Sequence, residues 1–199
     1  MDSSKLGFEP QLNDNDKIMF YKYLDKCTNY FEYGSGGSTY QAAIRSNIKN
    51  IYSVENNSIW YEKMKLILKN SSNVKYLYCN MKTIDGTAGR PAPGSTLEQW
   101  IDYSSQIKKL TPEESKEIDV VLIDGRFRVA SCLNCFNVLN DDCYIIFDDF
   151  LYRPQYHVVL DYYEIIEKTD DNRMVVLKKK REKTPPPPEL IEKYEKDSD

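Results

Sequence analysis

The stretch Glu32-Tyr33-Gly34-Ser35-Gly36-Gly37-Ser38 decides how this sequence folds. It ends a short aromatic run that starts at Asn29 and is rich in strand-forming residues. Ser38 is a suitable N-cap for a helix that continues to about Ser46. Glycines let the backbone turn sharply and approach a ligand with no Cβ in the way. The stretch therefore predicts a strand, a ligand-facing turn and a helix.

Strand and helix patterns alternate through the rest of the chain. Further strands are expected at 50–55, 74–78, 118–123 and 143–147, and helices at 58–69 and 127–139. The near-continuous apolar run at 118–123 indicates a strand that is buried on both faces. This alternation predicts a doubly wound, Rossmann-like α/β fold with a parallel sheet.

The C-terminal strands break this alternation. Residues 162–167 and 173–179 have the composition of strands, and Asp170-Asp171-Asn172 between them suits a tight turn. Two strands joined in this way pair as an antiparallel hairpin. We therefore expect a seven-stranded sheet, mostly parallel, with an antiparallel C-terminal hairpin.

The organisation of the chain is expected to be one α/β domain over residues 1–180. Residues 1–28 have the pattern of an N-terminal helical segment, with Asp14 or Asn15 as its cap. Residues 81–117 form a long insertion of loop and helix, either functional or a surface excursion. The Pro-rich, charged tail 181–199 is expected to be mobile, with a docked helix around Leu190, Ile191 and Tyr194 as the alternative.

Composition excludes several classes of protein. The chain has 199 residues, 41% of them hydrophobic, and a formal net charge of −4, which suits a packed domain and gives little support for nucleic-acid binding. No apolar run approaches the roughly 18 residues of a membrane span, and no signal peptide is expected. The odd count of five cysteines then predicts reduced thiols and a cytoplasmic location.

Polar residues follow five strands of the predicted sheet. They are Glu32 to Gly37, Glu55, Asn80, Asp124, and Asp148 with Asp149. Ligands of open parallel α/β sheets bind beyond the carboxyl ends of the strands. These residues are therefore expected to line one ligand site.

This order and spacing, from about Asn29 to Lys179, resemble the class I S-adenosylmethionine-dependent methyltransferases. The resemblance implies that the loop 32–38 holds the methionine part of S-adenosyl-L-methionine, with Glu32 accepting from its amino group. It implies that Glu55 binds both ribose hydroxyls, and a surface glutamate that begins a helix is the alternative. The cofactor-binding residues expected on this basis are Glu32, Gly34, Ser35, Gly36, Ser38, Thr39, Glu55, Asn56, Asn80 and Asp124.

A nicotinamide dinucleotide is the main rival cofactor. Its G-x-G-x-x-G fingerprint, counted from Gly34, requires a glycine at Thr39. The acidic residue two positions before Gly34 and the antiparallel ending also favour the methyltransferase interpretation.

The carboxylates Asp124, Asp148 and Asp149 are similar to those of metal-dependent small-molecule O-methyltransferases, including sugar O-methyltransferases of antibiotic biosynthesis. The resemblance implies that they hold Mg²⁺ or Mn²⁺, which would bind the acceptor hydroxyl and lower its pKa. In the alternative, Asp148 and Asp149 cap the following turn and Asp124 contacts the cofactor or loop backbone.

The catalytic candidates are Asp124, Asp148 and His157, with His157 as a general base or, in the alternative, a structural histidine. Candidate acceptor contacts are Arg126, Arg153, Tyr156 and Trp100. The arginines, including Arg128, could instead neutralise the carboxylates. The insertion 81–117 is expected near this acceptor site.

The sequence thus predicts an S-adenosylmethionine-dependent O-methyltransferase acting on a small polar acceptor, with a sugar or glycan first. The Asn/Asp-Pro-Pro-Tyr/Phe tetrapeptide of many amino methyltransferases is absent, which favours oxygen as the acceptor atom. The alternatives are a methyltransferase acting on RNA or protein, and a non-catalytic cofactor-binding module. No membrane partner is expected, and a homodimer is left open.

Overall fold

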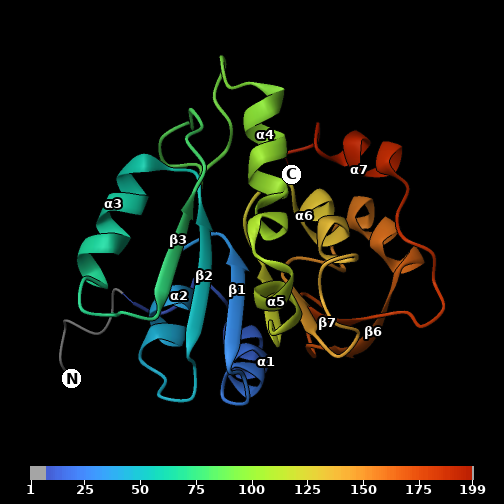
Figure 1. The fold of residues 1–199 in the computed structure, drawn as a ribbon, viewed down its shortest axis with the longest axis horizontal. Helices are drawn as coiled ribbons and strands as arrows, with labels where there is room; N and C mark the ends of the chain where they lie inside the picture. Colours follow the sequence, from blue (N-terminus) through green and yellow to red (C-terminus); the bar gives the residue numbers. More distant parts are fainter. Residues whose placement is uncertain (1–7, 199) are drawn as a thin grey trace.

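Seven strands form one sheet in the computed structural model, which describes residues 8–198 (Figure 1). They are β1 (Asn29–Tyr33), β2 (Asn50–Glu55), β3 (Val74–Tyr78), β4 (Val120–Ile123), β5 (Tyr144–Phe147), β6 (Tyr163–Lys168) and β7 (Val175–Lys179). Their order is β3-β2-β1-β4-β5-β7-β6. The first five strands pair in parallel, and β7 runs antiparallel to both β5 and β6. The predicted fold is confirmed.

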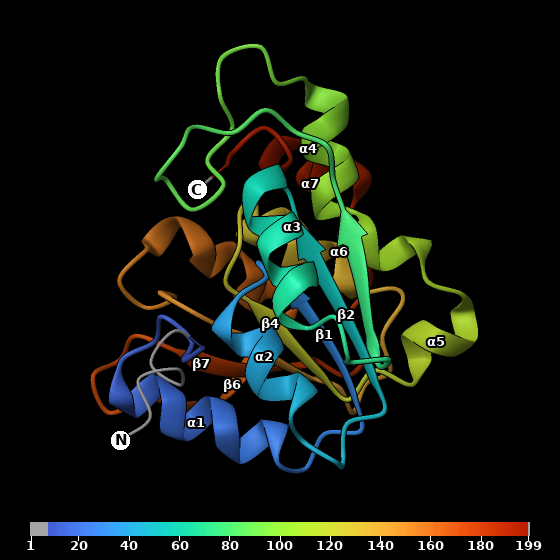
Figure 2. The same ribbon diagram turned by 90° about the vertical axis from the view of Figure 1, so that its left-hand side faces the viewer.

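Helices cover both faces of this sheet (Figure 2). One face carries α1 (Asp14–Leu24), α2 (Gly37–Ala43) and α3 (Ser58–Ile67), and the other carries α4 (Leu97–Ser104), α5 (Pro112–Lys116) and α6 (Arg128–Cys135). The 3₁₀ helices are η1 (Gln106–Lys109) and η2 (Pro154–Asp161). The last helix, α7 (Pro188–Tyr194), packs against α6. The strand order reverses between β1 and β4, and ligands bind at such a switch point in open α/β sheets.

Alternation along β4 explains how the sheet has two cores. Val120 and Leu122 pack with the α1 side, whereas Val121 and Ile123 pack with the α6 side. Successive side chains of a strand point to opposite faces, so an all-apolar strand serves both layers. Parallel pairing with β1 then places the ends of both strands at one edge of the sheet.

Several local expectations were wrong. The N-cap of α1 is Asn13, whose Oδ1 accepts from the Asp16 amide at 2.8 Å, rather than Asp14 or Asn15. The helix after the glycine-rich turn begins at Gly37, because the Ser38 hydroxyl donates to Glu32 instead of capping the helix.

The C-terminal tail takes the form of the docked alternative, since Ile191 of α7 is buried in the α6-side core. Residues 1–7 of the predicted N-terminal segment lie outside the described residues. All five cysteines are free and buried. Within residues 8–198, no helix combines the length and apolar character that crossing a membrane requires.

Candidate active site

The glycine-rich turn lies against the loop that follows β4. Gly34 has φ +99°, a left-handed value that glycine adopts without strain, and a Cβ there would lie 3.1 Å from Gly125 Cα. The turns after β1 and β4 therefore touch, and Gly34 has no room for a side chain.

The buried Glu32 side chain stabilises this turn through hydrogen bonds. Its Oε1 accepts from the hydroxyls of Thr39 and Ser53, and its Oε2 accepts from those of Ser38 and Tyr30. Burial raises the pKa of Glu32, and these hydroxyls counteract the rise. A carboxylate accepts about four hydrogen bonds, so the fully buried Glu32 is already satisfied within the protein. Glu32 therefore positions the turn together with Ser38 and Thr39, and direct contact of these three residues with a cofactor stays a prediction.

Glu55 ends β2 beside this turn. It is 6% exposed, which excludes the surface-glutamate alternative, and its Oε1 accepts from the backbone amides of Asn56 (2.8 Å) and Asn57 (2.7 Å). Burial raises its pKa to about 7, while the amides of Asn57, Asn56 and Ser35 lower it. The carboxylate is therefore fixed at the carboxyl end of β2, beside β1, and its pKa of about 7 lies near neutral pH.

Trp60 also contacts the glycine-rich turn, and the sequence does not predict this contact. Its indole Nε1 donates to the carbonyl oxygen of Ser35 at 2.7 Å, and the Ser35 hydroxyl lies 2.6 Å from the Ser53 hydroxyl. A Cβ added to Gly36 would meet nothing closer than the Trp60 ring, at 4.0 Å. The turn is thus anchored on both sides and leaves open space in front of Gly36.

A cavity of about 370 Å³ lies where β2 and β3 end. Its lining includes Asn57, Asn80, Met81 and Lys82. Asn80 is exposed, and its carbonyl accepts from Gln99 at 2.8 Å. Asn80, one of the predicted cofactor-binding residues, therefore borders this cavity.

Residues 84–90, which we call the strap, form a closed loop at the carboxyl edge of the sheet, since the Ile84 amide donates to the Arg90 carbonyl at 2.9 Å. The Asn56 amide Nδ2 donates to the Gly89 carbonyl at 2.8 Å. Two residues earlier in the loop, Arg126 Nη2 donates to the Thr87 carbonyl at 2.6 Å. The strap belongs to the insertion 81–117, which lies above the strand ends (Figure 2). The Arg126 side chain thus fastens the strap, and its predicted contact with an acceptor stays a prediction.

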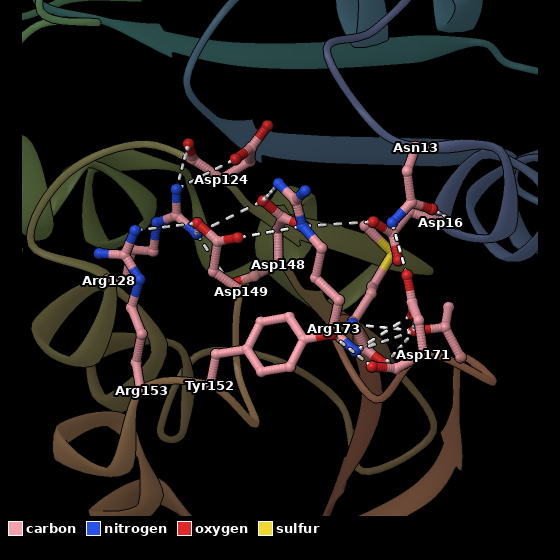
Figure 3. A network of polar contacts seen from close by, with 12 residues as sticks. Asn13, Asp16, Asp124, Arg128, Asp148, Asp149, Tyr152, Arg153, Asp171 and Arg173 are labelled. Atoms are coloured by element: carbon pink, nitrogen blue, oxygen red, sulfur yellow. Dashed lines mark hydrogen bonds and ion pairs between the residues drawn. The ribbon is translucent and has the colours of Figure 1, made fainter.

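The carboxylates after β4 and β5 belong to an aspartate–arginine cluster, shown in Figure 3. Its members are Asp16, Asp124, Arg128, Asp148, Asp149, Arg153 and Arg173. Arg128 pairs with Asp124, Asp148 and Asp149 at 3.2–3.6 Å. Phe127, which precedes Arg128 in the chain, and Asp149 both have φ in the left-handed region, a form of strain that concentrates at functional sites.

The predicted metal site is not supported. Within residues 8–198, no group of three or more His, Cys, Asp or Glu side chains could hold a metal ion. The reason is visible in the cluster: arginines contact the carboxylates of Asp124, Asp148 and Asp149 that a divalent ion would need. The alternative, in which arginines neutralise the carboxylates, is the one that the structure shows. Asp148 is 2% exposed, so it is placed to position its neighbours rather than to contact an acceptor.

Other candidate acceptor contacts are engaged within the protein. Tyr156 is 1% exposed and accepts from Arg153 Nη1 at 3.1 Å, so it is buried rather than available to a ligand. Trp100 donates to the Ser95 hydroxyl at 2.9 Å and packs on Phe127. His157 Nε2 lies 3.3 Å from the Phe150 carbonyl, a structural hydrogen bond. Its role as a base stays a prediction.

Asp16 on α1 is the buried outer end of the cluster. Neither side-chain oxygen has a hydrogen bond, and Arg173 Nε lies 3.4 Å away. Burial raises the pKa of Asp16 to about 6, with the Asp148 and Asp171 charges adding to the rise. A raised carboxyl pKa contributes stability below the unfolded value of 3.8, and that contribution is lost as pH rises through about 6.

Asp16→Asn is therefore expected to raise the free energy of unfolding near pH 8, by at most about 3 kcal/mol. The gain should shrink as pH falls through about 6, because wild-type Asp16 is then protonated and neutral. Urea unfolding across this pH range measures it. Asp14→Asn, exposed on the same helix, is the control and should leave the pH profile unchanged. A destabilised Asp16→Asn protein near pH 8 would contradict the prediction.

Comparisons with known proteins identify the fold. No family model matches the chain, and no curated protein matches its sequence. A methyltransferase-like protein from Silicibacter pomeroyi DSS-3 superposes with a TM-score of 0.82 and 24% identity, over 95% of this chain and 97% of that one. A caffeoyl-CoA O-methyltransferase candidate from Staphylococcus aureus gives 0.50 and 17%, over 86% of both chains.

A tRNA methyltransferase from B. subtilis gives a TM-score of 0.52 with 13% identity, over 86% of this chain and 68% of that one. The protein therefore has the class I methyltransferase fold. By their names these neighbours act on unlike acceptors, and a shared fold does not select among them.

Proposed function

We propose that the protein is an S-adenosyl-L-methionine-dependent methyltransferase that methylates a hydroxyl of a small polar acceptor. The observation that carries the proposal is Glu55, a buried carboxylate held by two backbone amides beside the glycine-rich turn. A carboxylate placed there can accept hydrogen bonds from both hydroxyls of a ribose. The glycine-rich turn at the switch point supports the same cofactor.

The chain's residues fit such a cofactor along the carboxyl edge of the sheet. The open space before Gly36 would take the methionine part, and the hollow beside Asn80 and Met81 would take the adenine. When bound, the cofactor supplies an electrophilic methyl group on its sulfonium sulfur. Glu32 keeps the turn in shape, and the strap covers the site and limits access of water.

Asp124 is the base in this proposal. It follows Ile123, the last residue of β4, and precedes Gly125, which touches the glycine-rich turn; the Asp124 side chain is 29% exposed. Burial raises the pKa of Asp124, as do the Asp148 and Asp149 charges, while Arg128 lowers it. A raised pKa brings a carboxylate closer to the range in which it accepts a proton from a hydroxyl at neutral pH. The proton would pass to Asp124 as the hydroxyl oxygen attacks the methyl carbon, and the bond between that carbon and the sulfonium sulfur would break to release S-adenosylhomocysteine.

A sugar hydroxyl is the first acceptor to test. It is supported by the spacing of Asp124, Asp148 and Asp149, which resembles that of sugar O-methyltransferases. The proposed transfer needs no ion, because three arginines, Arg128, Arg153 and Arg173, already pair with these three carboxylates.

Calorimetry with S-adenosylhomocysteine tests the cofactor, and one-to-one binding is expected. Mass spectrometry after incubation with S-adenosylmethionine should then show the gain of one methyl group on a member of a panel of sugars, glycosides and phenols, with tRNA included. Asp124→Asn should lower kcat strongly and leave S-adenosylhomocysteine affinity nearly unchanged. No binding at high micromolar ligand contradicts the cofactor, and methylation of tRNA alone contradicts the small acceptor.

A further inference from the structure

Arg128 lies between the end of β4 and the end of β5, beside Asp124, Asp148 and Asp149 of the aspartate–arginine cluster (Figure 3). Its Nε donates to the Gly125 carbonyl at 3.0 Å. Nη1 donates to the Asp148 carbonyl at 2.7 Å and to Asp149 Oδ2 at 3.4 Å. Nη2 donates to the Asp124 carbonyl and to Asp124 Oδ1, both at 3.2 Å. A guanidinium carries five N–H donors, and these five acceptors use all of them.

This side chain is a built-in part of the site. Only 11% of it is exposed, and three of its five acceptors are backbone carbonyls, which stay in place whatever the protonation of the carboxylates. Burial works against its charge, but the neighbouring groups, Asp124 first, outweigh burial and raise the pKa of Arg128. The guanidinium is therefore charged wherever the protein is folded.

A divalent ion would compete for the same carboxylate oxygens. Mg²⁺ and Mn²⁺ prefer such oxygens as ligands, and here Asp149 is also paired with Arg153 at 3.1 Å and Arg173 at 3.0 Å. An ion seated among these carboxylates would lie next to fixed positive charges in a partly buried site, where repulsion is weakly screened. The carboxylates suit an ion only if Arg128 is removed.

We infer that the Arg128 guanidinium is the permanent cation of this cluster, in the place where the residue pattern predicts a divalent ion. The wild-type protein consequently takes up no ion there. Arg128 is a positioning residue that joins the ends of β4 and β5 and fixes Asp124. The inference does not rest on the proposed function, because ion binding is measured without cofactor or acceptor.

Mn²⁺ calorimetry on the wild-type protein and on Arg128→Ala tests this inference. Wild type should show no binding at this cluster at low millimolar Mn²⁺. Arg128→Ala should bind Mn²⁺ at least about tenfold more tightly than wild type, with an affinity in the range of weak oxygen-ligand sites. Its Tm should also rise with Mn²⁺, because removal of the arginine leaves buried carboxylates unpaired.

Two further variants sharpen the test. Arg128→Lys keeps a cation and should gain no affinity for Mn²⁺. This result would show that the positive charge of Arg128, and not only the volume of its side chain, keeps the ion out. Arg45→Ala, which breaks an ion pair with Asp25 outside the cluster, is the matched control and should also gain none. A gain by either variant equal to that of Arg128→Ala overturns the inference.

Wild-type Mn²⁺ binding that disappears in Asp148→Asn also overturns it, as does a folded Arg128→Ala protein with no gain. An Arg128→Ala protein that folds only with Mn²⁺ supports it. If that variant folds under neither condition, wild type and Arg128→Lys decide: an ion bound by either at Asp148 overturns the inference, and none in both supports it.

Discussion

Glu55→Ala is expected to weaken S-adenosylhomocysteine binding by about 100-fold, equivalent to roughly 2.8 kcal/mol. The reason is that one buried carboxylate would accept from two ribose hydroxyls. Hydrogen bonds to charged groups contribute about 1.5–3 kcal/mol each, so the expected loss lies near the lower end of the range for two such bonds. Calorimetry with the ligand measures the loss, and circular dichroism verifies the fold. Glu62→Ala is a matched control, since Glu62 lies on α3 with its side chain 67% exposed. Unchanged affinity in Glu55→Ala would remove the ribose role.

The pH dependence of binding gives this prediction a second signature. Burial raises the pKa of Glu55 to about 7, and only the ionised carboxylate accepts from both hydroxyls. Because the competent fraction falls as the carboxyl group protonates, affinity should be about tenfold weaker near pH 6 than near pH 8. Glu55→Gln keeps an oxygen for the amides of Asn56 and Asn57 and should bind weakly with a flat pH profile.

The same raised pKa makes Glu55 unfavourable for the ligand-free fold at high pH. Its contribution to stability is present below its ordinary value of 4.5 and is lost as pH rises through about 7. Ligand-free Glu55→Gln should therefore be more stable than wild type near pH 8. A residue that destabilises the empty protein while binding a ligand is consistent with a functional site rather than a structural one.

Local patterns explain which parts of the fold were predictable from sequence. The bounds of β1, β2 and β3 match their predictions, because turn residues or polar residues delimit each apolar run. The strand at 118–123 was predicted two residues too long, because β4 begins at Val120. Asp119, just before it, accepts through its carboxylate from the amides of Thr28 and Asn29. The short helix α5 was missed, although Thr111 and Glu114 form a capping box around Pro112.

The site was predictable where it depends on strand ends and not where it depends on strand order. Glu55 is identifiable as the last residue of its strand. Arg173 reaches Asp148 only because β7 pairs with β5, an arrangement that no local pattern specifies. Trp60 of α3 likewise contacts Ser35, which lies in the turn after another element, β1. An aromatic residue in the first turn of a helix is common for many other reasons, so the sequence alone does not indicate this contact.

Gly125→Ala is expected to be the most destabilising of these substitutions, lowering the free energy of unfolding by about 3 kcal/mol. A Cβ at this position would overlap the Tyr103 hydroxyl and lie 2.9 Å from the backbone carbon of Tyr33. Tyr103 is 1% exposed and its hydroxyl accepts from the Arg126 amide, so the ring cannot swing aside. For a domain of this size the loss corresponds to a Tm lower by about 10 °C, which calorimetry would detect.

A double-mutant cycle identifies the origin of that loss. Tyr103→Phe removes the overlapping hydroxyl, so adding it to Gly125→Ala should restore part of the stability and leave the part due to the Tyr33 backbone. Gly36→Ala is the matched control, because a Cβ there meets nothing closer than 4.0 Å. If Gly125→Ala unfolds at the same temperature as Gly36→Ala, the close packing of the turns after β1 and β4 is wrong. The placement of Asp124 beside the methyl group would then lose its basis, because that placement depends on the same contact between Gly34 and Gly125.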